Sequence, residues 1–426
     1  MDLIPAVSRE IESAVSSIGR ADVMVAIPAY NAEDTISKVM TVVAEGLSTF
    51  FADRKTVLFV VEGGSLDETK NVALSTDIGL VVNKIVGTYR AQQLGKGNAL
   101  RAAFKAAIDL GVEGLALIDA DVRSITPDWV NNLLSPVIHE SYDFVTPYYK
   151  RYKYDGTITN AIVYPLISAL YGKRIRQPIG GEFALSSRFI EILKDQDVWD
   201  VFVGQYGIDA WLTITALTNN VKICQANLGA KVHNAKDPAF SLGPMYLHVL
   251  STVFRSMNKF EDVWIDLFSF EDVSVLGTAV LQEPEPIPIS VTRLVGEFEL
   301  GMLHFSSLYR EILQPDTYAR LEQIVGSGVC KPDKYCEFHM PPDLWARIVY
   351  DLAVVFNCWK GNTHKLIELS SPLYFGEVAS LANRIMDLDF EEAERVIADN
   401  AHVFESEKVY LVERWREMEA GKVCSM

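Results

Sequence analysis

Apolar runs and amphipathic stretches alternate along the first third of the chain. Runs of apolar residues that end in small or polar residues predict buried strands, and they occupy residues 23–30, 56–64, 79–87 and 114–122. Helical periodicity predicts the elements between them, at residues 33–47, 66–75 and 94–111. Strands that alternate with helices every 20–30 residues form parallel βαβ units. The pattern therefore predicts an α/β fold with a mostly parallel sheet flanked by helices.

The rest of the chain changes character near residue 281. Residues 127–260 stay mixed, with further helices expected at 127–139, 157–170, 186–194 and 206–219. The segment LQEPEPIPIS at 281–290 carries three prolines and predicts an extended connection. Beyond it the pattern is helical, at residues 291–313, 342–358, 375–398 and 403–419. We therefore expect one α/β domain over residues 1–280 and a helical domain over residues 291–426.

Polar residues follow the predicted strands where the chain turns into the next helix. Such strand-to-helix joins lie at 28–33, 62–66 and 118–128. In a parallel sheet these joins share the carboxyl edge, where ligands bind. Ser65 is also placed to cap the helix at 66–75, with Glu68 at the spacing of a capping box. The chemistry should come from the carboxyl edge.

Composition and charge narrow the classes of function. The 426 residues carry a formal charge of −17, which disfavours binding to a nucleic-acid backbone or to an anionic membrane surface. Apolar residues make up 49% of the chain, too many for a disordered protein. No stretch is long and apolar enough for a transmembrane segment, and the N-terminus does not resemble a signal peptide. Five scattered cysteines predict no disulfide framework, so we expect a cytoplasmic protein.

Two aspartates end the fourth predicted strand. In ALIDADV, Asp119 and Asp121 are two residues apart, so a strand would aim both carboxylates at one face. Close carboxylates repel unless a cation lies between them, and oxygen ligands suit Mg²⁺ or Mn²⁺. A strand-to-helix turn whose acids cap the helix would have the same sequence. This motif alone therefore does not decide between a metal site and such a turn.

Two further segments suit a nucleotide. Glu62 precedes Gly-Gly-Ser and can accept hydrogen bonds from a base or a ribose, or belong to a plain turn. Lys96 lies in LGKGNAL, where glycines and the free N–H groups of a following helix suit an anion. The spacing is not that of a Walker loop, and a flexible turn is the alternative.

Four other positions are candidates for binding. Arg151, in YYKRYKY, can hold a carboxylate or a phosphate, or belong to a solvated loop. QPIGGE at 177–182 can offer backbone N–H groups to an anion, or form a tight turn. Asp209 begins an apolar helix, where an acid is favoured by the helix dipole alone. His233 can ligate a metal, but a single histidine carries little weight.

Taken together, the motifs resemble one family. IPAYN, VEGGSLDET, GKGNA and IDAD occur in this order and are similar to those of glycosyltransferases with the GT-A fold that use nucleotide sugars. RQPIGGEFALSSRF, YGIDAWLTI and GAKVHN resemble mannosylglycerate synthase and the glucosyl-3-phosphoglycerate synthases. The resemblance covers residues 22–260 well and extends faintly into the helical region. It implies that residues 1–280 are a GT-A domain that binds a nucleotide sugar.

For the donor, the resemblance implies a role for each motif. Pro28, Tyr30 and Glu62 would line the pocket for the base, and Lys96 would contact the ribose or the diphosphate. Asp119 would lie at the ribose. The divalent metal, Mg²⁺ or Mn²⁺, would be held by Asp121 and His233. The first strand departs from mannosylglycerate synthase in its PAYN sequence, which leaves GDP- and UDP-linked donors open.

For the acceptor, the resemblance implies a second set of residues. Arg151 and the backbone of Ile179, Gly180 and Gly181 would hold its carboxylate or phosphate, with Thr159 beside them. Asp209 would face the sugar hydroxyls or the acceptor. The implied reaction is retaining transfer of glucose or mannose to a small hydroxy acid such as glycerate or 3-phosphoglycerate, with Asp209, Asp121 and Lys96 as the catalytic residues.

Other functions stay open on sequence alone. The acceptor can be another sugar or a lipid, and a nucleotidyltransferase would show a similar glycine-rich loop and metal acids. A sensor that binds the nucleotide sugar without turnover would need the same donor site. We expect no nucleic-acid partner and no transmembrane segment, and a helical C-terminal region is a common place for a homodimer contact.

Overall fold

The computed structural model describes residues 7–90, 94–194, 196, 198–233, 243–280, 282–326, 329–330 and 336–423. The chain divides into two compact units. The sheet unit comprises Met1–Arg151, Ile175–Asn234 and Val273–Glu285, and the helical unit comprises Tyr152–Arg174, Ala235–Asp272 and Pro286–Met426. Each unit consists of three segments of the chain, whereas the sequence suggested two continuous domains. The domain boundary expected at 281–290 stays a prediction.

The sheet unit is built on one eight-stranded sheet in the order β10-β8-β5-β7-β4-β1-β2-β3. Its strands are β1 (Val23–Ala29), β2 (Thr56–Glu62), β3 (Asn83–Thr88), β4 (Gly114–Leu117), β5 (Phe144–Lys150), β7 (Phe183–Ser186), β8 (Ile223–Ala230) and β10 (Val275–Leu276). Only β7 runs antiparallel to its neighbours, β4 and β5, and the other described pairings are parallel. The carboxyl ends of seven strands therefore meet at one edge, together with the amino end of β7.

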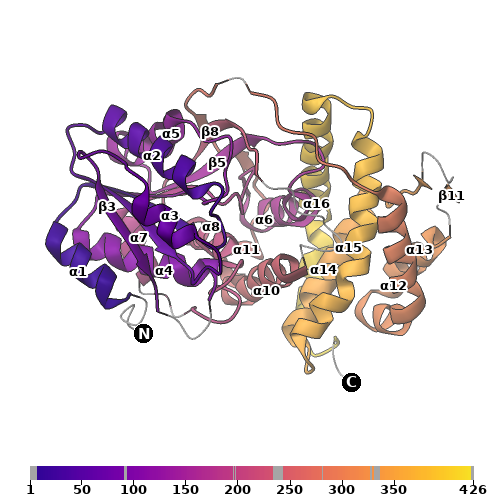
Figure 1. Ribbon diagram of the computed structural model, residues 1–426. Helices are drawn as coiled ribbons and strands as arrows, with labels where there is room; N and C mark the ends of the chain where they lie inside the picture. The colour runs from indigo at the N-terminus through magenta and orange to yellow at the C-terminus, as the bar shows by residue number, and fades with distance from the viewer. Residues whose placement is uncertain are drawn as a thin grey trace. The chain divides into compact units, whose positions relative to one another are not determined.

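Helices cover both faces of this sheet (Figure 1). They are α1 (Arg9–Ile18), α2 (Ile36–Phe50), α3 (Thr69–Ser75), α4 (Lys96–Leu110), α5 (Pro127–Glu140), α7 (Ser187–Lys194) and α8 (Ile208–Thr218). One hydrophobic core joins the sheet to α1, α4, α7 and α8, and a second joins it to α2, α3 and α5. Burial on both faces explains why β1 and β2 are almost continuously apolar. The predicted mostly parallel α/β sheet is confirmed.

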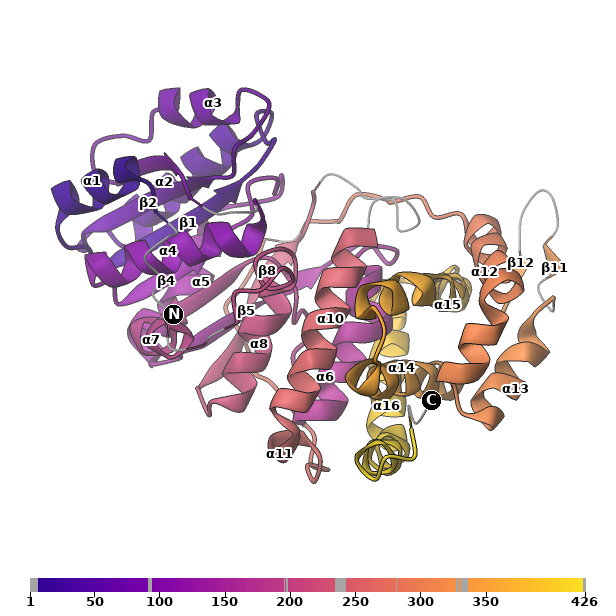
Figure 2. The same cartoon turned by 90° about the horizontal axis from the view of Figure 1, so that it is seen from below.

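The helical unit consists mainly of helices (Figure 2), with one short parallel pairing, β6 with β9, and one short antiparallel pairing, β11 with β12. Its elements are η2 (Thr159–Val163), α6 (Tyr164–Tyr171), β6 (Lys173–Arg174), α10 (Gly243–Lys259), α11 (Glu261–Trp264), β9 (Glu271–Asp272), α12 (Val291–Ile312), α13 (Pro315–Ile324), β11 (Val329–Cys330), β12 (Cys336–Glu337), α14 (Pro342–Cys358), α15 (Thr363–Ile385) and α16 (Phe390–Glu419). η2 is a π-helical turn that leads directly into α6. The helical C-terminal region expected from the sequence is therefore present.

Two boundaries in this unit differ from the prediction. The helices expected at 375–398 and 403–419 are instead α15 and the single long helix α16. Asp389 begins α16 with a capping box: Glu392 N donates to Asp389 Oδ1 at 2.8 Å, and Asp389 N donates to Glu392 Oε2 at 3.1 Å. This local signal outweighs the uninterrupted helical periodicity that favoured a helix across residue 389.

Two cysteines and the character of the helices bear on the predictions of no disulfide framework and no transmembrane segment. Cys358 is disulfide-bonded, which the scattered cysteines of the sequence did not predict, because spacing in the chain does not reveal spatial proximity. Cys224 is a free, buried thiol. None of the helices in the described ranges has both the length and the apolar character needed to cross a bilayer.

A buried lysine joins three segments of the helical unit. Lys408 of α16 is fully buried, and its Nζ donates to the carbonyl of Leu170, at the end of α6, and to that of Leu267. Two carbonyl dipoles compensate a buried ammonium only in part. Burial therefore lowers the pKa of Lys408 to about 7.

This lowered pKa predicts a pH dependence of stability. Between about pH 7 and the ordinary lysine pKa near 10.4, the unfolded chain holds a proton that the folded chain has lost, so stability rises with pH. Replacing Lys408→Met should remove this contribution, a slope of at most about 1.4 kcal/mol per pH unit. Urea unfolding at pH 7 and pH 9 measures it, with the exposed Lys365→Met as the control. Equal slopes in the wild type and in Lys408→Met would contradict the prediction.

Candidate active site

The carboxyl edge of the sheet gathers charged residues from separate parts of the chain. Glu62 ends β2, Asp119 follows β4, and Lys231 follows β8. Because β7 runs in the opposite direction, Glu182, which precedes it, lies at the same edge. Lys96 begins α4. The topology therefore brings together residues that are up to 169 positions apart, as Glu62 and Lys231 are.

Asp119 lies between two lysines. Lys96 Nζ is 2.9 Å from Asp119 Oδ1, and Lys231 Nζ is 3.7 Å from Asp119 Oδ2. Each lysine also pairs with a second acid: Lys96 with Asp209 Oδ2 at 3.2 Å, and Lys231 with Glu182 Oε2 at 2.7 Å. The result is a chain of alternating charges, Asp209–Lys96–Asp119–Lys231–Glu182, which we call the charge network.

Burial and pairing shift the pKa values along the charge network. Burial alone would lower the pKa of Lys96, but the nearby carboxylates of Asp119 and Asp209 outweigh it and raise that pKa. Burial raises the pKa of Asp209, and the ammonium of Lys96 opposes this shift. Burial likewise raises the pKa of Glu182 against the effect of Lys231. Lys96 is therefore a permanent cation near neutral pH.

The sequence predicted that the two glycines around Lys96 would leave the start of α4 open to an anion. The structure shows instead that backbone N–H groups there are already hydrogen-bonded. Gly97 N donates to the carbonyl of Gln205 at 3.1 Å, and Asn98 N donates to that of Gly204 at 3.0 Å. A Cβ on Gly97 would lie 1.8 Å from the carbonyl oxygen of Val203. The glycines allow the turn at 203–205 to cap the helix, which places Asp209, four residues after this turn, beside Lys96.

The Gly-Gly pair of QPIGGE packs against Asp119. Gly181 has a φ of +96°, and a Cβ there would lie 2.2 Å from Asp119 Oδ2. The carbonyl of Gly180 accepts a hydrogen bond from Lys231 Nζ at 2.8 Å. Gly180 and Gly181 are buried, and Ile179 is half-buried. The turn thus forms one wall of the site, and an acceptor role for its backbone stays a prediction.

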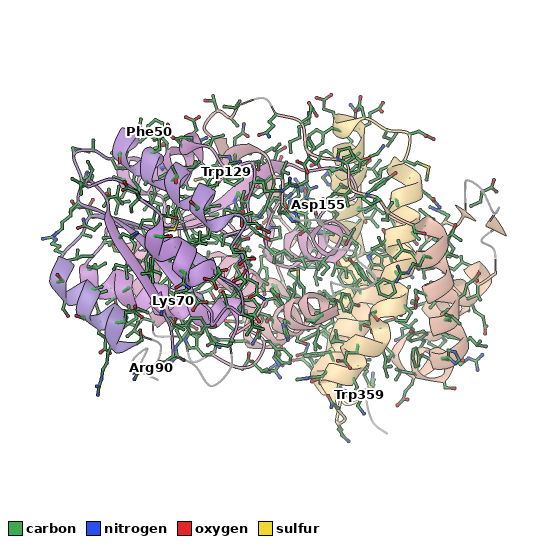
Figure 3. All side chains as sticks on the ribbon, viewed as in Figure 1. Phe50, Lys70, Arg90, Trp129, Asp155 and Trp359 are labelled. Carbon is green, nitrogen blue, oxygen red and sulfur yellow. The ribbon has the colours of Figure 1, made fainter. Side chains whose placement is uncertain are left out.

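Three members of the site, Tyr149, Glu182 and Lys231, were not predicted. The hydroxyl of Tyr149 donates to Glu182 Oε2, which also accepts from Lys231. Trp129, labelled in Figure 3, reaches from α5 to place its ring centroid 5.5 Å from that of Tyr149. Glu182 and Lys231 lay inside quoted motifs, QPIGGE and GAKVHN, but only the pairing of β5 with both β7 and β8 shows that they meet. Tyr149 had no signal beyond an aromatic-rich segment.

Two carboxylate oxygens of the charge network are buried without a partner in the part of the chain that the structure describes. They are Asp209 Oδ1 and Glu182 Oε1. Buried polar atoms in native proteins are nearly always hydrogen-bonded to protein, water or a ligand. Asp209 is thus held by Lys96 through one oxygen and can accept a hydroxyl group through the other.

The residues expected to line the base pocket lie at the ends of β1 and β2. Asn31 N donates to Ser65 Oγ at 3.0 Å, and Leu66 N donates to Asn31 Oδ1 at 2.9 Å, so the two loops are cross-linked. Ser65 therefore does not cap the following helix, which begins later, at Thr69, with Glu68 as its N-cap residue. This corrects the capping-box prediction.

Glu62, Tyr30 and Pro28 lie at or next to the strand ends from which these loops start. Burial alone would raise the pKa of Glu62, but hydrogen bonds from Ser65 and Thr88 lower it, so its carboxylate stays ionised. Tyr30 exposes 55% of its surface, and Pro28, in β1, is half-buried. An ionised acceptor beside an exposed aromatic ring suits a nucleoside, and these three roles stay predictions.

The two predicted metal ligands come from adjacent segments. Arg123 N donates to the carbonyl of Val232 at 2.8 Å, and Val232 N donates to Ser124 Oγ at 2.9 Å. Asp121 and His233 flank these bonds. Across the described ranges, no three His, Cys, Asp or Glu side chains cluster as a metal site would require. A carboxylate and an imidazole fit a divalent ion that completes its shell with phosphate oxygens and water.

The expected acceptor residues divide between the two units. Arg151, at the end of the first segment of the sheet unit, places its guanidinium 5.3 Å from the ring centroid of Tyr149. Thr159 opens η2 in the helical unit, where it is buried. The role of each in acceptor binding stays a prediction.

A mostly parallel sheet with charged residues gathered at its carboxyl edge is the arrangement in which α/β proteins bind nucleotides and related ligands. Residues 18–253, more than half of the chain, match the family model described as "Mannosylglycerate synthase, GT domain". The chain therefore belongs to this family. The match confirms the resemblance and the GT-A fold predicted from the motifs, and the protein is a nucleotide-sugar glycosyltransferase.

Solved structures give weaker similarities. Glucosyl-3-phosphoglycerate synthase from Mycobacterium tuberculosis, in complex with Mg²⁺ and UDP, is 24% identical, with a TM-score of 0.46 over 60% of this chain and 84% of that chain. The same enzyme with Mn²⁺, UDP-glucose and phosphoglyceric acid is 23% identical, with a TM-score of 0.44 over 59% and 83% of the two chains. A search of curated protein sequences finds no significant match.

The packing of Gly97 gives a test of how the site is built. Alanine favours helices over glycine by about 1 kcal/mol, so Gly97→Ala should stabilise α4 if propensity decided. Because its Cβ would strike Val203, we expect destabilisation by about 1–3 kcal/mol instead. Gly296→Ala is the matched control, since a Cβ in that part of α12 meets no atom within 4 Å. Equal effects of the two substitutions on chemical denaturation would contradict this account.

Proposed function

We propose that the protein is a retaining hexosyltransferase that moves glucose or mannose from GDP or UDP to a small hydroxy acid, glycerate or 3-phosphoglycerate. The observation that supports this most is the charge network. It places a permanent cation, Lys96, next to an acid, Asp209, one oxygen of which has no partner among the residues that the structure describes, and both lie at the carboxyl edge of the sheet. A leaving diphosphate and a sugar hydroxyl are the complementary groups.

Lys96 acts on the donor. An ammonium has three hydrogen-bond donors, and the contacts with Asp119 and Asp209 use two of them. The third can bind a diphosphate oxygen, and the positive charge stabilises the negative charge that develops when the anomeric bond breaks. Asp119 orients the ammonium, because it is itself fixed by Lys231 and by the close approach of Gly181.

Asp121 and His233 would hold the divalent metal, Mg²⁺ or Mn²⁺, and the ion would neutralise the diphosphate as a Lewis acid. This role falls to Asp121 rather than to Asp119, since the two carboxylate oxygens of Asp119 already face the lysines. A divalent ion bound by one carboxylate together with substrate phosphates is a common arrangement for Mg²⁺.

Transfer with retention fits attack on the same face of the sugar that the diphosphate leaves. The acceptor hydroxyl forms the new bond to the anomeric carbon, the bond to the diphosphate oxygen breaks, and that oxygen takes the hydroxyl proton. Asp209 holds a sugar hydroxyl through its unpartnered oxygen, and Arg151 holds the carboxylate or phosphate of the acceptor. Fixing both reactants supplies much of the rate enhancement. Trapping of a glycosyl–Asp209 adduct would replace this route by double displacement.

The proposed reaction can be tested with a panel of substrates. The protein is incubated with Mn²⁺ or Mg²⁺, each of GDP-mannose, GDP-glucose, UDP-glucose and UDP-mannose, and glycerate or 3-phosphoglycerate. We expect one donor to yield a glycosylated hydroxy acid, detected by its mass, together with free nucleoside diphosphate. Nucleotide-sugar binding with no release of diphosphate for any acceptor would instead identify a sensor.

The metal site predicts the effect of one substitution. Asp121→Asn removes the charge of the proposed ligand without changing its size, so we expect transfer activity to fall by at least about a hundredfold. Binding of Mn²⁺ with the nucleoside diphosphate, followed by electron paramagnetic resonance, should weaken in parallel. Asp77→Asn, in the loop that leads to the amino end of β3, controls for the loss of one charge. Unchanged Mn²⁺ binding in Asp121→Asn would exclude Asp121 as a ligand.

A further inference from the structure

The proline-rich segment that follows β10 belongs in part to the sheet unit. β10 runs parallel to β8, with Val275 opposite Gln225, and therefore points toward the carboxyl edge. Asn132 Nδ2 donates to the carbonyl of Thr278 at 2.8 Å and fixes the chain beyond β10. Residues 282–285, which we call the acidic strap, then reach the edge where the site lies. Pro284 restricts its backbone.

The acidic strap pairs with two cations of the site's rim. Glu283 Oε1 is 2.6 Å from Lys150 Nζ. Glu285 accepts from both terminal nitrogens of Arg123, at 3.1 Å and 2.5 Å. Lys150 is the last residue of β5 and precedes Arg151, and Arg123 lies two residues after Asp121. The strap thus neutralises positive charge next to both the proposed acceptor residue and the proposed metal ligand.

Two other cations of the edge, Lys96 and Lys231, are also paired with acids. Lys96 contacts Asp119 and Asp209, and Lys231 contacts Glu182 and Asp119. Of the two acceptors named above, glycerate carries one negative charge, whereas 3-phosphoglycerate adds a phosphate with a charge of about −1.5 to −2. Lys96, Lys231, Lys150 and Arg123 are thus each matched by a carboxylate, and an edge with this charge balance suits the acceptor with fewer negative charges.

We propose that the acidic strap determines the charge of the acceptor: Glu283 and Glu285 favour a hydroxy acid with a single carboxylate over its phosphorylated form. This inference rests on the proposed function and adds to it the class of acceptor. The four side chains of the two pairs are partly exposed, with Glu283 at 81% and Glu285 at 56%. Exposed pairs contribute little to stability, so removing them should alter selectivity and leave the fold intact.

The test is the double variant Glu283→Gln and Glu285→Gln, which keeps the shape of both side chains. Binding of glycerate and of 3-phosphoglycerate to the full chain is measured calorimetrically with Mn²⁺ and nucleoside diphosphate present, and kcat/KM is measured for both acceptors. We expect the preference for 3-phosphoglycerate over glycerate to rise about tenfold, roughly threefold for each charge removed. Glu113→Gln is the matched control, because Glu113 pairs with Arg54 at the opposite edge, before β4.

The outcomes separate this inference from the proposed function. An unchanged preference, an equal gain for both acceptors, an equal shift in Glu113→Gln, or a wild-type protein that prefers 3-phosphoglycerate would overturn the role of the strap. If the wild type transfers no hexose to either acceptor but the double variant still shifts the ratio of the two binding constants, the proposed function fails and the charge selection by the strap stands.

Discussion

The position of Asp119 between Lys96 and Lys231 is the constraint on which the rest of the site depends. Buried charges are tolerated only when each is paired, and here three buried and two half-buried charges alternate in one network. Gly181 leaves the space that the carboxylate of Asp119 occupies, and Gly97 lets the turn before α8 approach α4. Both glycines are therefore needed for the close packing around the charge network rather than for backbone flexibility.

The network also explains how an acidic protein can bind a diphosphate. Net charge describes the whole surface, whereas a ligand responds to the groups within a few ångströms. The N–H groups of Gly97 and Asn98, in the first turn of α4, are used internally by the turn at 203–205. We therefore expect the positive charge that faces a donor to come from the side chain of Lys96 and from the proposed metal ion rather than from these backbone groups. In our proposal, the two glutamates of the acidic strap then disfavour an acceptor with more negative charge.

The sequence predicted the sheet well and the network only in part. Continuous apolar runs identified β1, β2, β3 and β4, and the polar residues expected after them lie at the carboxyl edge of the sheet. Asp119, Lys96 and Asp209 were each proposed from separate motifs, and the structure brings them into contact. Glu182 and Lys231 were missed as site residues because they meet through the antiparallel insertion of β7, which local periodicity does not reveal.

Other errors have equally local causes. The glycines of GKG fit a phosphate loop as well as they fit close packing, and only the position of residues 203–205 decides between the two. Ser65 had the spacing of a capping residue but is used to join two loops. Asp389 and Glu392 carried a true capping box that the periodicity of the surrounding helix concealed.

The most direct test of the charge network is a crystal structure of the protein with Mn²⁺ and a nucleoside diphosphate, with the metal located by anomalous scattering. The account predicts that Mn²⁺ lies on Asp121 and His233 against the diphosphate, that Lys96 contacts a diphosphate oxygen, and that Asp119 remains between Lys96 and Lys231. A diphosphate bound away from this edge, or an Asp119 that has left both lysines to bind the metal, would contradict it.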